Sequence, residues 1–223
     1  MSQNLPPSDR SRVRRVADRG RYDHETVHSI VDAAYLCHVA FADEHGVHCI
    51  PTACWREGEY LYIHGSNGSR MLKALTGQGA CVTITHLDGL VLARSAFHHS
   101  MNYRSVVVHG RFEVVPAEHK AESMNRFMDH IAEGRRHEAR PGDANELAAT
   151  TLLRIPLAES SAKIRTGGPK DDAADMSREV WAGVLPLTMV GGSPQPDGAE
   201  RPVPDYVQQW AGGVAKAARV PIA

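Results

Sequence analysis

The chain has few of the residues that mark several large classes of protein. It contains four cysteines (Cys37, Cys49, Cys54 and Cys81), and none is spaced as in zinc knuckles or CxxC redox motifs. They lie in or beside apolar stretches, so we expect reduced, buried thiols and no disulfide framework. The net charge is −1. No global basic field therefore favours nucleic acid or an anionic membrane as a partner.

Long hydrophobic runs are also absent. No stretch approaches the roughly 20 apolar residues that span a bilayer. The N-terminus is polar and rich in arginine, so we expect neither a signal peptide nor an anchor, and a cytoplasmic protein. The 223 residues, 42% of them hydrophobic, suffice for one globular domain. We expect a flexible arm over residues 1–20, a domain over 21–190, and an extension over 191–223 that packs on the domain or on a partner.

Turn signals recur about every ten residues, which is too close for the crossovers of a parallel sheet. The apolar patterns between them predict strands over residues 35–41, 47–55, 60–64, 80–87, 90–94, 103–115, 152–157 and 161–165. Helical spacing predicts helices over 24–34 and 117–133, a short one from residue 70, and a weak one over 203–218. Six or seven strands joined by tight turns predict a mainly β protein, a closed antiparallel barrel with peripheral helices.

Three positions in this pattern carry more specific expectations. Asp88-Gly89 is typical of a two-residue hairpin turn of the primed type. Gly110 interrupts the longest strand signal and indicates a bulge or a bend. Pro51 cannot donate to a sheet ladder, so it marks an edge, a bulge or a place where the backbone faces a ligand.

The stretch after the third strand has the composition of an anion-binding turn. The strand over residues 60–64 breaks at Gly65, a loop of small polar residues follows, and a helix begins near Arg70. A phosphate needs donors such as the backbone N–H groups of a helix start, the hydroxyls of Ser66 and Ser69, and the guanidinium of Arg70. The alternative is an ordinary strand-to-helix turn capped by a serine.

Several motifs follow one another in an order that is more specific than any one of them. They are Pro51-Thr52, the stretch from Tyr60 to Arg70, Asn102–Gly110, Lys163–Pro169 and Val180–Pro186. Together they resemble the FMN-binding split barrels related to pyridoxamine 5′-phosphate oxidase, in the branch of nitroimidazole-resistance-type flavoproteins. The resemblance spans about residues 20–190. It implies a homodimer of six-stranded antiparallel split barrels, with FMN in clefts at the subunit interface.

The same resemblance implies which residues surround the FMN. Pro51 and Thr52 would lie alongside the flavin ring, and Ser105 would lie against it. The phosphate and ribityl chain would be held by His64, Gly65, Ser66, Ser69 and Arg70. Trp181, with Lys163 and Arg165, would approach from the C-terminal part of the chain. Such a site suits FMN because its phosphate requires charge-assisted donors and its ring requires an apolar wall with a few aimed donors.

The segment after Val180 departs from the specific oxidases of that family. Trp181–Pro186 is apolar where those enzymes have an arginine-rich segment that grips the substrate phosphate, which argues against vitamin B6 oxidation. We therefore expect an FMN-dependent oxidoreductase that passes electrons to a small organic substrate, with no assigned catalytic side chain. Two alternatives remain, a flavin- or haem-binding carrier or sensor without turnover and an interaction module with an empty cleft.

The histidines offer candidate metal or haem ligands, namely His98 and His99 together with His64, His86 and His109. His98 and His99 are adjacent, so in a strand they would point to opposite faces and could not share one metal ion. No carboxylate or cysteine stands at ligand spacing beside them, and no metal site is expected. Haem is harder to exclude because it needs only one axial histidine and a flat apolar slot.

Overall fold

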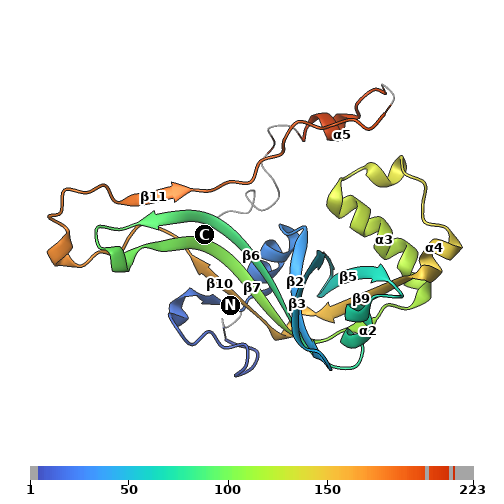
Figure 1. The fold of residues 1–223 in the computed structure, drawn as a ribbon, viewed down its shortest axis with the longest axis horizontal. Helices are drawn as coiled ribbons and strands as arrows, with labels where there is room; N and C mark the ends of the chain where they lie inside the picture. Colours follow the sequence, from blue (N-terminus) through green and yellow to red (C-terminus); the bar gives the residue numbers. More distant parts are fainter. Residues whose placement is uncertain (1–4, 199–200, 211–212, 214–223) are drawn as a thin grey trace.

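The computed structural model describes residues 5–198, 201–210 and 213, and its described strands form two open antiparallel sheets (Figure 1). The larger sheet has seven strands in the order β1-β10-β7-β6-β2-β3, with β11 paired to β6, and the smaller has the order β4-β5-β9-β8. The mainly β, antiparallel fold is confirmed. The sheets do not close into one cylinder, and the count of six strands is not confirmed. The homodimer stays a prediction.

Every strand pairing described is antiparallel. The strands of the larger sheet are β1 (Gly20–Arg21), β2 (Leu36–Asp43), β3 (Gly46–Ala53), β6 (Gly79–Leu92), β7 (Ser100–Arg111), β10 (Ser160–Arg165) and β11 (Gly183–Pro186). Those of the smaller sheet are β4 (Trp55–Glu57), β5 (Tyr60–Ser66), β8 (Glu113–Val114) and β9 (Thr150–Pro156). The predicted strand positions are confirmed to within a few residues, apart from the segment around Asp88 described below.

The main core is built from alternate residues of both sheets. Ile63, Val82, Val106 and Ile155 are almost fully buried and belong to one apolar cluster that also includes residues of α1 and α2. Burying each such side chain contributes roughly 1.5–3 kcal/mol. This alternation decides which residues of each strand face the core and which face outward.

Within the described residues, five α-helices accompany the sheets: α1 (His24–Asp32), α2 (Arg70–Leu75), α3 (Ala117–Ile131), α4 (Ala144–Ala149) and α5 (Asp205–Gln208). The predicted helices over 24–34 and 117–133 and the short helix from residue 70 are confirmed. Of the stretch 203–218, only residues 205–208 are helical, and residues 211–212 and 214–218 lie outside the described residues. α4 was not predicted, although Asp143 and Glu146 form a capping box at its start.

The predicted hairpin turn at Asp88-Gly89 is wrong. β6 continues through both residues with an irregularity in register between Leu87 and Gly89, and the chain turns only after Leu92. Two contacts explain the difference. Asp88 binds the guanidinium of Arg104 on β7, and a Cβ on Gly89 would lie 3.0 Å from the carbonyl oxygen of Leu185 on β11. The glycine therefore admits a third strand instead of making a turn.

The bulge expected at Gly110 is also absent, because the register of β6 and β7 is continuous there. A Cβ at this position would meet the side chain of Ile155 at 3.2 Å. Gly110 thus allows a residue of the smaller sheet to approach the larger one closely.

The far halves of β6 and β7 project from the body of the molecule and, with β11, form an extension that we call the arm, residues 87–103 and 183–186 (Figure 1). Leu185, Leu90 and Met101 are register neighbours across its three strands. All three are exposed. The arm therefore presents an apolar row that no described residue of the chain covers.

The N-terminal segment from residue 5 onward contacts the larger sheet. The ammonium of Lys163 on β10 donates to the carbonyl of Arg15 at 3.0 Å, and Arg10 pairs with Glu159 in the turn just before β10. Flexibility of residues 1–20 and packing of residues 191–223 stay predictions. Among the described residues, no helix is long and apolar enough to cross a membrane.

Candidate functional site

The turn between β5 and α2 is closed by its own hydrogen bonds. The N–H of Ser69 donates to the carbonyl of Ser66 at 2.9 Å, and the hydroxyl of Ser66 accepts from the N–H of Gly68 at 3.2 Å. Ser69 caps α2, accepting from the N–H of Leu72 at 3.4 Å. A Cβ on Gly65 would lie 3.0 Å from the Leu72 side chain, so a larger residue there would have to displace that leucine. The capped turn offered as the alternative is therefore present, and both hydroxyls keep a proton to donate to a ligand.

Arg70 extends from this turn with its side chain 58% exposed. Its Nε lies 3.6 Å from a carboxylate oxygen of Asp43, at the end of β2. His48 bonds the other oxygen of Asp43 at 2.8 Å. That bond, more than the nearby Arg70, lowers the pKa of Asp43. Arg70 is thus an accessible cation held loosely near the β2–β3 turn, as a phosphate ligand must be.

Ser105 and Lys163 lie on the face of the larger sheet that points away from the core. They are register neighbours on β7 and β10, and Ser105 donates to the carbonyl of Lys163 at 3.3 Å. Alternation of the strands defines this outer sheet face as Pro51, His38, Thr83, Val107, Thr85, Ser105 and Lys163. Thr52 pairs with buried Cys37 and points to the inner side. The residue expected against a flavin ring thus lies half-exposed on the outer sheet face, among mostly small side chains.

The predicted site residues fall into two groups within one chain. Ser66, Ser69 and Arg70 lie beside the β2–β3 turn, whereas Lys163 is on β10, four strands away from Pro51 on β3. At about 4.8 Å per strand, that separation is about 19 Å. Among the described residues, no hydrogen bond or ion pair joins the two groups.

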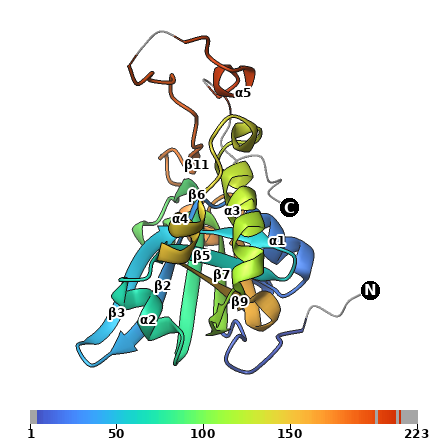
Figure 2. The same cartoon turned by 90° about the vertical axis from the view of Figure 1, so that its right-hand side faces the viewer.

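His64 packs under α3 instead of beside the turn (Figure 2 shows this helix against β5 and β9). Its ring centroid lies 4.6 Å from that of Phe127 on α3 and 5.8 Å from that of Trp55. Its Nδ1 is buried without a hydrogen-bond partner. Sequence reasoning placed His64 at the phosphate, but the strand alternation turns it to the opposite side of β5 from Ile63 and into this aromatic cluster.

Burial lowers the pKa of His64, because the charged imidazolium is poorly solvated under α3. The unfolded chain therefore binds a proton more readily than the folded one, and stability is expected to fall as the pH drops below about 6.5, the ordinary value. Urea unfolding at about pH 7.5 and about pH 5.5 measures this. His64→Phe should reduce the difference between the two pH values, and an unchanged difference would remove His64 as its source.

Arg165 and Trp181, both predicted to approach the cofactor, occupy different surroundings. Arg165 is buried; its guanidinium donates to the side-chain oxygen of Asn102 and to the carbonyls of Gly167 at 3.3 Å and Gly168 at 3.2 Å. It therefore holds the chain that leaves β10. Trp181 is 64% exposed at the start of the arm's third strand, and its ring packs close over Gly183. Only Trp181 is accessible to a ligand.

The thiols are all free, as expected, but they are not all buried. Cys37 and Cys54 are buried, Cys81 is half-buried, and Cys49 is exposed on β3. A hydrogen bond with Cys54, together with burial, raises the pKa of the Cys37 thiol well above its ordinary value. Cys37 is thus an unreactive core residue.

A family model for pyridoxamine 5′-phosphate oxidase matches residues 23–164, more than half of the chain. This chain belongs to the pyridoxamine 5′-phosphate oxidase family. The family predicted from the order of the motifs is therefore confirmed. No curated protein matches the chain.

Two solved structures resemble this family member over most of their length. The flavocytochrome Anf3 from Azotobacter vinelandii is 40% identical to this chain. The match includes 93% of this chain and 99% of the flavocytochrome, with a TM-score of 0.88. The FAD and haem binding protein from Mycobacterium smegmatis is 35% identical. The match includes 87% of this chain and 98% of the M. smegmatis protein, with a TM-score of 0.83. A candidate 5-nitroimidazole antibiotic resistance protein from Bacteroides thetaiotaomicron shares the fold. It is 20% identical, and the match includes 65% of this chain and 86% of that protein, with a TM-score of 0.55.

Sequence reasoning missed one cluster of this family member altogether. His24 and His28 stand four residues apart in the predicted helix, a spacing that places both on one face. That signal was available. Glu59, which lies against them, is 31 residues further along, and only the fold brings it there.

Proposed function

We propose that this chain is a flavin- and haem-binding electron-transfer protein. The observation that carries the proposal is the 40% identity to a flavocytochrome over 93% of the chain. The family model ends at residue 164, so this likeness includes most of the sequence beyond it. The second relative, named for FAD and haem, supports the same pair of cofactors.

The outer sheet face fits the flavin. An isoalloxazine ring is flat and amphipathic, and it needs an open apolar surface with a few donors at its rim. Thr83, Ser105 and Val107 are small and half-exposed. The Lys163 ammonium donates to the carbonyl of Arg15 at 3.0 Å and keeps further protons for a ligand, and the Ser105 hydroxyl oxygen can accept a hydrogen bond. A flavin supplies the electron transfer when bound, while these residues hold and orient it.

The phosphate would be held by the second group, Ser66, Ser69 and Arg70. Pro51 and Lys163 are about 19 Å apart across the larger sheet, and no described hydrogen bond or ion pair joins the two groups, which favours a site completed by a second copy of the chain. We therefore keep the homodimer, with the cofactor at its interface, as part of the proposal. FAD is favoured over the FMN expected from the sequence, because the M. smegmatis relative is named for FAD.

The arm offers surroundings that suit haem. Leu90, Met101 and Leu185 form its exposed apolar row. At its tip, the ring Nδ1 of exposed His99 lies 3.1 Å from the carbonyl of Ser95. A carbonyl only accepts, so Nδ1 carries the proton and Nε2 keeps a lone pair with which His99 would bind the haem iron.

The absorption spectrum of the purified chain, supplied with haem and FAD or FMN, tests both cofactors. We expect the two flavin bands together with an intense Soret band. His99→Ala should lose the Soret band and keep the flavin bands, whereas His45→Ala, an exposed histidine of the β2–β3 turn, should keep both. A Soret band unchanged in His99→Ala would contradict that assignment.

Bleaching of the flavin bands by NADH or NADPH, followed by recovery with a small organic acceptor, would identify an oxidoreductase. Loaded protein that no such donor reduces would instead be a carrier or sensor without turnover.

A further inference from the structure

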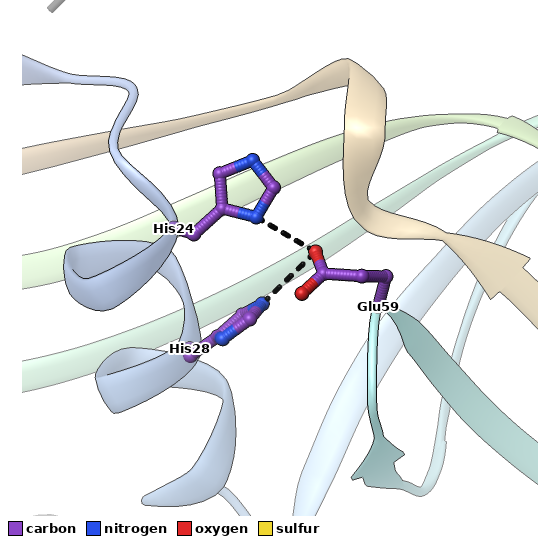
Figure 3. Close-up of side chains that lie close together, drawn as sticks. All are labelled: His24, His28 and Glu59. Carbon is purple, nitrogen blue, oxygen red and sulfur yellow. Dashed lines mark hydrogen bonds and ion pairs between the residues drawn. The ribbon is translucent and has the colours of Figure 1, made fainter. Parts of the chain in front are cut away.

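Two histidines of α1 and one glutamate converge at the edge of the smaller sheet (Figure 3). His24 and His28 point from one face of α1 towards Glu59, which stands in the turn between β4 and β5. The three ligand atoms all lie within 4.8 Å of one another. α1 packs on the core side of the larger sheet, so this cluster is separate from the outer sheet face.

The distances suit a small transition-metal ion. Nε2 of His28 lies 3.4 Å from Oε2 of Glu59, and Nδ1 of His24 lies 2.7 Å from the same oxygen. Ligands about 2.0–2.2 Å from a tetrahedral Zn²⁺ are separated by about 3.3–3.5 Å. The His28–Glu59 pair already has that separation. The His24–Glu59 pair would have to move apart by less than about 1 Å, and both of its side chains are exposed.

One atom of the cluster is left without a hydrogen bond. Nε2 of His28 is buried and forms no hydrogen bond; its contact with the Glu59 carboxylate is an ion pair at 3.4 Å. Buried polar atoms of native proteins are normally satisfied, so an unsatisfied one calls for an explanation such as an ion that the protein binds.

The backbones that carry the three ligands are fixed independently of any metal. Asp23 caps α1 by accepting from the N–H of Thr26 at 2.8 Å. Arg56 on β4 pairs with Asp32 at the other end of α1, at 2.8 and 2.6 Å, and donates to the carbonyl of Gly58 at 2.7 Å. The helix and the turn that bears Glu59 are therefore preorganised, which a metal site requires.

We propose that His24, His28 and Glu59 bind a Zn²⁺ ion. Imidazole and carboxylate ligands suit zinc, and three protein ligands leave a fourth position open. His24 and His28 also line a cleft of about 780 Å³, together with Arg21, Asp23 and Leu157, so the open position is accessible to water or a small ligand.

Zinc content and affinity of the full chain test this site. After removal of metals with a chelator, one Zn²⁺ per chain should bind, and the midpoint of thermal unfolding should rise by about 5 °C, because the ion binds only the folded chain. His28→Ala and Glu59→Gln should each lower the affinity by at least about 100-fold and abolish that rise.

The controls are His45→Ala and Glu44→Gln, a histidine and a glutamate of the exposed β2–β3 turn, which should bind zinc like the parent chain. Unfolding of every variant in chelator shows whether it still folds. Two results would overturn the proposal: a parent chain that binds no Zn²⁺, or equal zinc affinity in the His28→Ala and His45→Ala variants. The three side chains would then only form hydrogen bonds and ion pairs with one another.

Discussion

Replacing Asp88 with alanine is expected to lower the free energy of unfolding by about 3–5 kcal/mol, because it removes the carboxylate that pairs in two places with the buried guanidinium of Arg104. The side chains of Arg104 and Asp88 are 2% and 10% exposed. Nε and Nη2 of the guanidinium donate to the two carboxylate oxygens at 2.9 and 2.8 Å, a bidentate arrangement. Denaturant unfolding measures the loss.

Two matched variants separate this effect from the loss of any carboxylate. Asp172→Ala removes an aspartate that is 79% exposed and should change stability by no more than about 0.5 kcal/mol. Adding Arg104→Met to Asp88→Ala should recover part of the loss, since it removes the buried charge that Asp88 had paired. If Asp88→Ala were no more costly than Asp172→Ala, the ion pair would not be what carries β6 through Asp88-Gly89.

Ser105→Arg is expected to weaken flavin binding by about 10–100-fold. The larger side chain would occupy the open surface where the proposed ring lies, and overpacking of that kind costs about 1–3 kcal/mol. The parent residue is half-exposed in the single chain, so the variant should still fold. Flavin affinity is measured by fluorescence quenching, with thermal unfolding as the check on folding.

Ala121→Arg is the control for added charge, because Ala121 is exposed on α3, away from the larger sheet. It should leave flavin affinity unchanged. Equal affinities for the Ser105→Arg variant and the parent chain would remove the outer sheet face from the site.

The strand positions could be predicted from the sequence because apolar alternation and turn residues are local signals. The exception at Asp88-Gly89 has a tertiary cause. A dipeptide typical of turns became part of a strand because its carboxylate has a cation on the neighbouring strand and its glycine admits β11. The error at α4 is of the opposite kind, because no helix was predicted there although a local capping box begins at Asp143.

The candidate site could be predicted only in part, for similar reasons. Ser69 and Arg70 follow shortly after the end of β5, so the local sequence pattern was enough to predict that they lie at the start of α2. The direction in which His64 points depends on which face of β5 packs against α3, and no local pattern fixes that. The carboxylate of Glu59 meets His24 and His28 only in the folded chain.

The most direct measurement of the central claim is the flavin content of the chain isolated without added cofactor. The protein is denatured, and the released nucleotide is identified by chromatography and quantified against the chain. We expect a flavin, as FAD, at about one per chain, in a protein that is coloured before denaturation. A colourless protein that releases no flavin, and that takes up neither FAD nor FMN when they are supplied, would contradict the account.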